Sequence, residues 1–160
     1  MGSTNEVREA TVEDAAEIYA LACELAETVG DAPPREEAVR KRLKELLEEP
    51  RACVLVAEGE GGVVGAASLW IKPDLAHGDA VIEVPMLVVS GSARRRGVGK
   101  LLIQEIQSIA ADENAALIEL VATKENDVAR AFYRSLGFVE TDHIALEFIG
   151  DVQSPPDTEG

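Results

Sequence analysis

Sixteen consecutive residues carry most of the information in this chain: Leu87-Val88-Val89-Ser90-Gly91-Ser92-Ala93-Arg94-Arg95-Arg96-Gly97-Val98-Gly99-Lys100-Leu101-Leu102. The stretch opens as an apolar run, passes through a loop that contains glycine, and closes with helical periodicity. A loop that leads into a helix N-terminus directs unpaired backbone N–H groups and the positive end of the helix dipole toward one point. Gly97 and Gly99 lack Cβ atoms, which leaves room for a phosphate near the backbone. The stretch therefore predicts a strand, an anion-binding loop and a helix.

The cations of this stretch favour a bound polyanion. Four of the fifteen Lys and Arg residues fall within seven positions: Arg94, Arg95, Arg96 and Lys100. Like charges at a helix N-terminus lower stability, and a bound anion would offset that cost. The alternative is an exposed basic loop in front of a helix that begins with glycines.

The spacing of the glycines narrows the choice of ligand. A P-loop, G-x-x-x-x-G-K-[ST], is excluded because Arg94 stands at its first glycine and leucine follows Lys100. The dinucleotide pattern G-x-G-x-x-G/A fails at Leu102. The pattern [RQ]-x-x-G-x-[GA] is met by Arg94, Gly97 and Gly99.

Periodicity and turn residues predict the elements on either side of the stretch. Helices are expected after a capping box at Thr11 up to Gly30, and over residues 35–48, 97–111 and 126–136. Strands are expected over residues 6–10, 52–57, 63–71, 80–89, 117–121, 138–139 and 143–148. Because strands and helices alternate after an initial meander, the fold class is a mixed α/β sheet.

Length and composition predict one soluble domain. A chain of 160 residues with 46% apolar residues suits a single core over residues 1–150, and residues 151–160 are expected to form a disordered tail. The N-terminal residues have neither the basic nor the apolar region of a signal peptide, so a cytoplasmic location is expected. The formal net charge of −15 disfavours nucleic acid and anionic membranes as partners and attracts cationic substrates. The alternative is an acid excess that only keeps the protein soluble.

The residues that commonly bind metals do not form a pattern. Cys23 and Cys53 stand apart in a helical and a strand segment, with no CxxC spacing. His77 and His143 have no ligand-like neighbours. We therefore expect two buried free thiols and no metal site.

With this strand, loop and glycine spacing, the sequence resembles the GNAT superfamily of acetyl-CoA-dependent N-acetyltransferases. Residues 94–99 look like the pyrophosphate loop of that family, and residues 87–89 look like the strand that pairs with the pantetheine arm. A second segment, Asn126-x-x-Ala129-x-x-Phe132-Tyr133-x-x-Leu136-Gly137-Phe138, looks like the family's other cofactor motif. The resemblance covers roughly residues 5–149. One departure is Ser90-Gly91, where the family often has proline, so that a somewhat looser loop is expected.

The resemblance implies both a fold and a reaction. The fold is a central, mostly antiparallel mixed sheet with splayed central strands and about four flanking helices. The reaction is transfer of the acetyl group of acetyl-CoA to a primary amine, by direct attack in a ternary complex. The expected cofactor-binding residues are Leu87, Val88, Val89, Arg94, Arg95, Arg96, Gly97, Val98, Gly99, Lys100 and Asn126.

Three catalytic roles follow from the resemblance and from the chemistry of amine acetylation: holding the thioester oxygen, protonating the leaving thiolate and deprotonating the acceptor ammonium. The backbone N–H of Val89 would hold the thioester oxygen. Tyr133, a phenol that stays protonated at neutral pH, would donate a proton to the leaving thiolate. The alternatives are that Val89 is an ordinary strand residue and that Tyr133 is an aromatic core residue. Asn126 would bind the cofactor, cap the next helix, or both.

Glu83 is the candidate general base that removes a proton from the acceptor ammonium. It interrupts an apolar strand, and with Pro85 it predicts a bulge in that strand. The alternative is a carboxylate that faces solvent or pairs with a cation, and Glu119 is the second candidate. Trp70 either contacts the acceptor or belongs to the core. Polyamines, aminoglycosides, amino acids and protein N-termini remain open as acceptors, and the acidic surface mildly favours a polycation.

Two other function classes remain open from the sequence. One is a non-catalytic acyl-CoA-binding or sensing module of the same fold, and the other is a nucleotide-binding protein that uses the arginine-rich loop. A homodimer is compatible with the apolar strand expected over residues 144–148.

Overall fold

The structure is a computed structural model that describes residues 4–153. The chain divides into two compact units that meet in sequence between Asp127 and Val128. Residues 154–160, most of the expected tail, lie outside the described residues. The single domain over residues 1–150 therefore stays a prediction.

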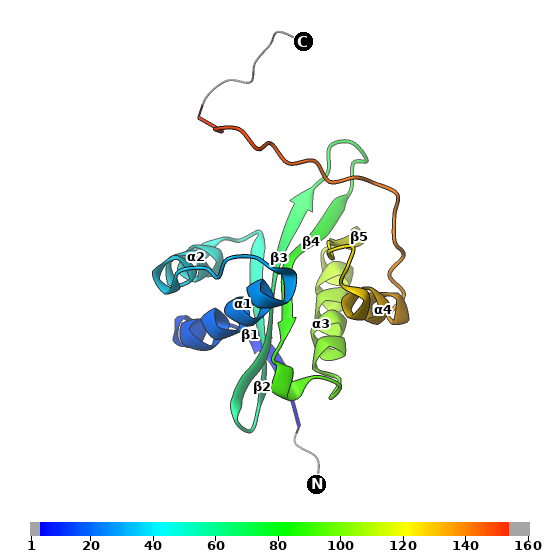
Figure 1. Ribbon diagram of the computed structural model, residues 1–160. Helices are drawn as coiled ribbons and strands as arrows, with labels where there is room; N and C mark the ends of the chain where they lie inside the picture. The colour runs from blue at the N-terminus through cyan, green and yellow to red at the C-terminus, as the bar shows by residue number, and fades with distance from the viewer. Residues whose placement is uncertain (1–3, 154–160) are drawn as a thin grey trace. The chain divides into compact units, whose positions relative to one another are not determined.

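The first unit contains a five-stranded sheet (Figure 1). Its strands, in sequence and in spatial order, are β1 (Glu6–Glu9), β2 (Ala52–Gly59), β3 (Gly62–Pro73), β4 (Ala80–Val89) and β5 (Ala115–Leu120). Neighbours are antiparallel except β4 and β5, which are parallel. The mostly antiparallel mixed sheet is confirmed.

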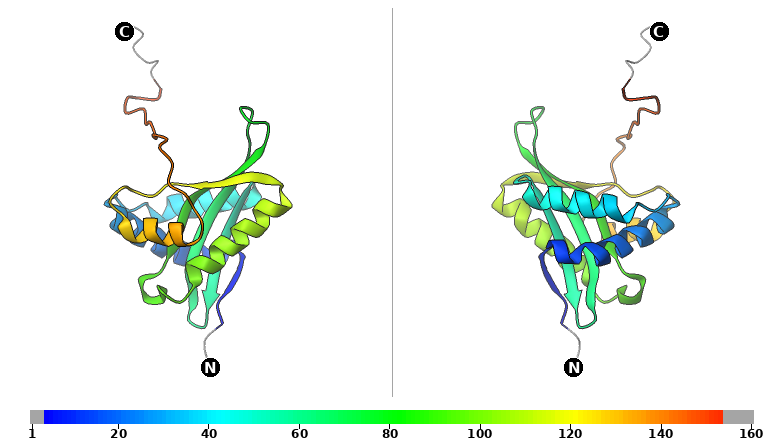
Figure 2. Two further views of the ribbon diagram at one scale, coloured as in Figure 1. Left: turned by 90° about the vertical axis from the view of Figure 1, so that its right-hand side faces the viewer. Right: turned by 90° about the vertical axis from the view of Figure 1, so that its left-hand side faces the viewer.

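Helices cover both faces of this sheet. The helices α1 (Ala15–Val29) and α2 (Glu36–Glu48) lie on one face, and α3 (Val98–Asp112) crosses the other (Figures 1 and 2). A parallel connection requires such a crossover, and α3 supplies it between β4 and β5. Two short 3₁₀ turns, Val12–Asp14 and Gly91–Ala93, precede α1 and α3.

Burial on two faces explains the nearly continuous apolar runs of the central strands. On the α1 and α2 face, Ile18 and Leu43 pack against Val54, Val56 and Val88. The largest fully buried side chains of the chain come mainly from β2 to β4 and from α3: Leu55, Leu69, Ile82, Leu102, Ile103 and Ile106. Leu47 of α2 is exposed.

An ion pair fixes the start of α1 against β1. Arg8 donates to both carboxylate oxygens of buried Asp14 at 2.9 Å, and the backbone N–H of Thr11 donates to the same carboxylate at 2.8 Å. The bond from the N–H of Thr11 to Asp14 is one half of the expected capping box. Arg8 is the main cause that holds the pKa of Asp14 below its usual range. The pair therefore joins two elements that are adjacent in the chain.

The second unit corrects the prediction for the chain after α4 (Asp127–Ser135). The helix ends as expected, because Gly137 has a φ of 96° and the N–H of Phe138 donates to the carbonyl of Tyr133. Within residues 138–153, however, the described chain has no strand, so the strands expected over residues 138–139 and 143–148 are wrong.

Two causes account for this difference. Glu140 accepts hydrogen bonds from Arg130 at 2.8 Å and from Arg134 at 2.7 Å, which ties the chain after Gly137 to α4. These arginines lower the pKa of Glu140 to about 2. Residues 143–148 keep the alternation of a strand, but alternation forms a strand only where a second strand supplies hydrogen bonds. The homodimer expected from this segment stays a prediction.

Candidate functional site

The C-terminal half of β4 has one open edge. In an antiparallel pair, residues alternate between those whose backbone groups face the partner and those whose groups face away. The N–H of Ser90 donates to the carbonyl of Val64 at 2.8 Å, which sets this alternation. Val88 therefore faces β3, whereas the N–H groups of Leu87 and Val89 face the side of β5.

No strand occupies that side within the described chain. The pairing of β4 with β5 ends at Val84 and Leu120, whereas the pairing of β4 with β3 continues to Val89. Pro85 lacks an N–H, so Leu87 and Val89 are the two donors of this open edge. The splayed central strands expected from the resemblance are thus present.

The loop after β4 is held to the rest of the first unit. Ala93 is buried, and the N–H of Gly91 donates to Oε1 of Glu24 on α1 at 3.1 Å. Arg95 and Gly97 have positive φ values of 65° and 78°. Glycine suits such a conformation, which reverses the chain directly before α3. These contacts lie where Ser90-Gly91 replaces the usual proline.

The helix that follows begins close to the sheet. The first hydrogen bond of α3 joins the N–H of Leu101 to the carbonyl of Gly97, so the N–H groups of residues 98–100 are not used within the helix. Gly65 of β3 permits the approach, because a Cβ there would lie 3.0 Å from Val98 Cγ1 and 3.2 Å from the carbonyl of Val88. Nothing in the sequence pattern marked Gly65, since its role depends on a contact between distant segments.

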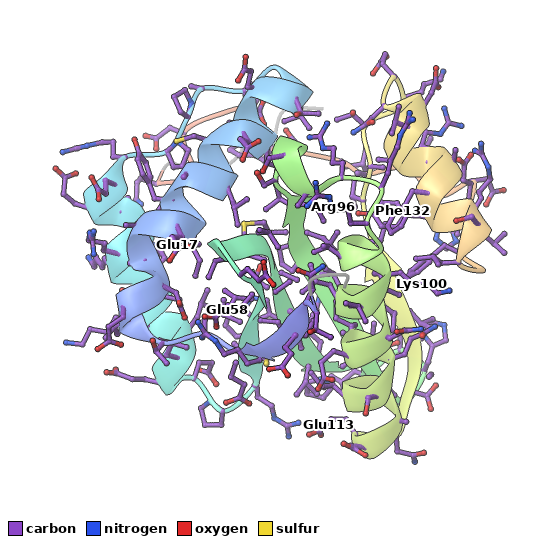
Figure 3. The ribbon with its side chains drawn as sticks, turned by 90° about the horizontal axis from the view of Figure 1, so that it is seen from below. Glu17, Glu58, Arg96, Lys100, Glu113 and Phe132 are labelled. Carbon is purple, nitrogen blue, oxygen red and sulfur yellow. The ribbon has the colours of Figure 1, made fainter. Side chains whose placement is uncertain are left out.

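The four cations of the loop and of the first turn of α3 are exposed. These cations are Arg94, Arg95, Arg96 and Lys100. None of them forms an ion pair with any residue between 4 and 153. Figure 3 shows Arg96 in the loop and Lys100 on the first turn of α3. Other cations, including Arg8 and Arg40, pair with carboxylates. Unpaired cations beside free N–H groups form a site that an anion can occupy.

The N-terminal half of β4 contains the expected bulge. Ser68 pairs with Met86 and Trp70 pairs with Glu83, so that β4 has one more residue than β3 between these two pairs. The extra residue lies next to Pro85, as the sequence predicted. It also changes which face Glu83 occupies, because side chains alternate along a strand. Glu83 thereby lies on the face of Ser68, Trp70 and Met86, which is the face covered by α1 and α2.

Glu83 has a cationic partner. Oε2 of Glu83 lies 2.5 Å from Nζ of Lys72, and the Glu83 side chain is 39% exposed. Glu119 of β5 is the register partner of Glu83, which brings the two candidate bases side by side on one face. Glu83 is the main cause that raises the pKa of Lys72, and Glu119 contributes. Pairing with a cation is one of the alternatives stated for Glu83, and the sequence alone does not identify Lys72 as that cation.

The two ends of β4 are well separated. Glu83 and Val89 are six residue steps apart along the strand, which corresponds to roughly 20 Å at ~3.3 Å per residue. Leu87 is nearer, at roughly 13 Å by the same measure. The structure thus unites Leu87 to Val89 with the cationic loop, and it unites Glu83 with Glu119, Lys72 and Trp70.

Tyr133 and Asn126 belong to the segment around α4. Tyr133 lies on α4 between two rings, with centroids at 5.3 Å for Phe132 and 5.6 Å for Phe138. Burial raises the pKa of Tyr133, so that its phenol is protonated at neutral pH. Asn126 directly precedes the first residue of α4, and its N–H donates to the carbonyl of Thr123 at 3.0 Å. The proton-donor role of Tyr133 and the cofactor role of Asn126 stay predictions.

Two further properties concern metal binding and membrane crossing by residues 4–153. Between residues 4 and 153, no group of three or more His, Cys, Asp and Glu side chains is arranged to hold a metal ion. In that range no helix has the length and apolar character needed to cross a membrane. Burial raises the pKa of the Cys53 thiol to about 11, which disfavours the reactive thiolate.

Known proteins share this sequence and this arrangement. The sequence model of the Acetyltransferase (GNAT) family matches residues 13–138. An aminoalkylphosphonate N-acetyltransferase from Salmonella typhimurium is 31% identical over 136 residues, which cover 85% of this chain and 86% of that protein. An aminoglycoside N(6')-acetyltransferase type 1 from the same species is 26% identical over 104 residues, which cover 63% and 72% of the two chains.

Solved structures show the same fold. An aminoglycoside N-acetyltransferase in complex with CoA superimposes with a TM-score of 0.81, at 22% identity over 92% of this chain and 96% of that one. An acetyltransferase from Trypanosoma brucei gives a TM-score of 0.73, at 26% identity over 91% and 100% of the two chains. The resemblance inferred from the loop and the strand before it is therefore confirmed, and the chain belongs to the GNAT family of acetyltransferases.

Proposed function

We propose that this protein transfers the acetyl group of acetyl-CoA to a primary amine by direct attack in a ternary complex. The observation that carries the proposal is the open edge of β4, which leads directly into a loop of cations that have no carboxylate partner among residues 4–153. An open strand edge suits the amide groups of a pantetheine arm, and the cations suit its diphosphate. The two features follow each other in the order in which CoA carries these groups.

In this proposal, each part of CoA meets a defined group of the first unit. The diphosphate contacts Arg94, Arg95, Arg96 and Lys100 and the free N–H groups at the start of α3. The pantetheine amides add to β4 as an extra strand would. The N–H of Val89 can then hold a pantetheine carbonyl, and the N–H of Leu87, farther from the loop, can hold the thioester oxygen.

The chemistry requires one bond to form and one to break. The amine nitrogen attacks the thioester carbon, and the C–S bond breaks as the amide forms. The N–H of Leu87, which lies farther from the cationic loop and nearer Glu83 than the expected donor Val89, stabilises the oxygen that gains negative charge. Glu83 accepts one proton from the acceptor ammonium before attack, and Tyr133 gives a proton to the departing thiolate. The nitrogen loses its second proton as the amide forms; this proton restores the phenol of Tyr133, and the proton on Glu83 passes to solvent. To accept the first proton, Glu83 exchanges Lys72 for the incoming amine.

Thermal melting tests the cofactor assignment. A ligand that binds only the native state raises the melting temperature by mass action. We expect acetyl-CoA and CoA to raise the midpoint of the protein and ATP to raise it much less. No shift with saturating acetyl-CoA would overturn the proposal, and a larger shift with ATP would favour a nucleotide-binding protein.

The ion pair between Glu83 and Lys72 favours one second candidate, a non-catalytic acyl-CoA-binding module. In such a module Glu83 would be a structural partner of Lys72 and no proton acceptor. The release of CoA thiol from acetyl-CoA in the presence of amines distinguishes the two functions. Tyr133→Phe should lower this release in an enzyme, and a variant with full turnover would remove the proton-donor role.

A further inference from the structure

An apolar cavity of about 220 Å³ lies between the sheet and the helices α1 and α2. It is open to solvent beside Ala38 and Arg42, which are exposed. Its lining side chains come from α1, α2 and the strands β2, β3 and β4: Ile18, Ala22, Pro34, Ala38, Val39, Arg42, Leu43, Leu46, Val54, Ser68 and Met86. Only Arg42 and Ser68 have polar side chains. Arg42 already donates to Glu45 at 2.8 Å, so the cavity offers a ligand little hydrogen bonding. The cavity is suited to an apolar group.

The cavity adjoins the candidate base along the sheet. Ser68 and Met86, which are register partners, form part of its wall. The next pair on the same face is Trp70 and Glu83, because the bulge in β4 restores this alignment. Two residues along a strand correspond to about 7 Å. An apolar cavity, an indole and a carboxylate therefore follow one another on one face.

We propose that the acceptor is a primary amine with an apolar aliphatic or aromatic substituent, which fills this cavity while the ammonium contacts Glu83. This inference rests on the proposed function, since it assigns the second substrate of the same reaction. Trp70 pairs with Glu83 on the same face as the cavity wall, and a second ammonium or a set of hydroxyls against that apolar wall would lose its water without finding partners. Arg42 further disfavours a polycation. The cavity thus opposes the preference for polyamines that the net charge alone suggested.

The size of the cavity limits the substituent. An apolar protein cavity of about 150 Å³ is known to bind benzene. A cavity of about 220 Å³ therefore accepts one phenyl ring or a short branched chain, with a spacer of two carbons to the amine. A substituent with two fused rings on a sugar-like scaffold would be larger than the volume of the cavity.

A panel of matched amines tests this inference through kcat/KM for CoA release. We expect 2-phenylethylamine and isoamylamine to exceed ethylamine by about 30-fold, since a buried apolar side chain contributes about 1.5–3 kcal/mol, and tenfold corresponds to about 1.4 kcal/mol. Spermidine should resemble ethylamine. Equal values for all four amines, or a preference for spermidine, would overturn the inference and leave the acetyltransferase proposal intact.

Filling the cavity provides the second arm. Ala22→Leu places a larger side chain in the wall, and the preference for 2-phenylethylamine over ethylamine should fall about tenfold with little change for ethylamine. The matched control is Ala20→Leu, which makes the same change at an exposed position of the same helix. If Ala22→Leu does not fold, Ala38→Leu on α2 replaces it. A preference that survives in both filled variants would contradict the inference.

A direct binding readout separates this inference from the cofactor assignment. Saturation-transfer NMR with the full chain detects contact between the protein and the phenyl protons of 2-phenylethylamine in the presence of CoA. We expect a signal that Ala22→Leu abolishes and Ala20→Leu preserves. Absence of the signal in the parent chain, when CoA raises its melting temperature, contradicts the cavity assignment alone. Absence of any CoA shift contradicts the proposed function itself.

Discussion

The two halves of β4 differ in how completely their polar groups are paired. Its first half has a strand on each side, and the one carboxylate there, Glu83, contacts Lys72. Its second half has a strand on one side, and the cations that follow have no carboxylate partner among the described residues. Unsatisfied groups at the surface of a folded protein mark the place where a ligand can supply what the fold does not. One strand thus separates a cationic, open half from an acidic, paired half.

The largest effect is expected at the paired half. In Glu83→Gln, kcat should fall by about 100-fold or more, because a general base contributes roughly 10²–10⁴-fold. The CoA-dependent rise in melting temperature should be unchanged, since the open half is intact. Steady-state kinetics with 2-phenylethylamine measures the effect. Glu119→Gln is the matched control, and an equal loss in both variants would show that the pair of carboxylates acts as one unit.

The next effect is expected at the open half. Arg94→Ala should raise the Kd for CoA about 10- to 100-fold, because a hydrogen bond to a charged group contributes about 1.5–3 kcal/mol. Isothermal titration with CoA measures this change. Arg51→Ala removes an exposed cation outside the loop and should leave the affinity for CoA unchanged. An unaltered affinity in Arg94→Ala would show that the diphosphate binds elsewhere.

A smaller effect is expected where the open half depends on close packing. The Cβ of Gly65→Ala would displace Val98 and the carbonyl of Val88, which lie within 3.2 Å of its position. We expect a loss of about 2 kcal/mol in unfolding free energy and a several-fold weaker affinity for CoA, because Val98 begins α3. Urea unfolding and CoA titration measure the two changes. Gly61→Ala, whose Cβ meets nothing within 4 Å, should change neither quantity.

The smallest effect is expected at an ion pair outside both halves. Arg8 lowers the pKa of Asp14 below its usual value near 3.8, so the stabilisation is present above that pH and is lost as the pH falls through the lower, native value. Asp14→Asn should therefore reduce the unfolding free energy by about 1–2 kcal/mol at pH 7. Its stability should approach that of the parent chain below about pH 4.

Two readouts identify this pair as structural. Urea unfolding at several pH values should show the narrowing difference for Asp14→Asn and none for Asp31→Asn, which alters an exposed carboxylate. The affinity for CoA should stay that of the parent chain. A pH-independent loss would mean that packing around Asp14, and not its charge, carries the effect.

Local patterns predicted the features that depend on neighbouring residues. The bounds of β4 agree with the prediction, and the bulge beside Pro85 occurs where the sequence placed it. Each of these depends on the conformational limits of one or two residues. Most of the sheet could be predicted in the same way, because its strands are apolar runs with clear turns between them.

Features that depend on pairing between distant segments could not be predicted. Lys72 meets Glu83 only because of the register between β3 and β4, and Gly65 meets Val98 only because α3 crosses the sheet. The alternation over residues 143–148 indicated a strand, but a pattern states which face would be apolar and not which strand is available as a partner. The wrong strand prediction over residues 143–148 and the unpredicted contacts of Lys72 and Gly65 thus share one cause, which is dependence on pairing between distant segments.

The single extra residue in β4 has a consequence for how this protein could diverge. It fixes the face of Glu83 while the residues from Met86 onward keep their own alignment with β3. Deleting that residue would turn Glu83 and every side chain before it to the opposite face, and the strand after it would be unchanged. A lineage could therefore exchange the entire exposed surface of the first half of the strand in one deletion event, and the open half would be inherited intact.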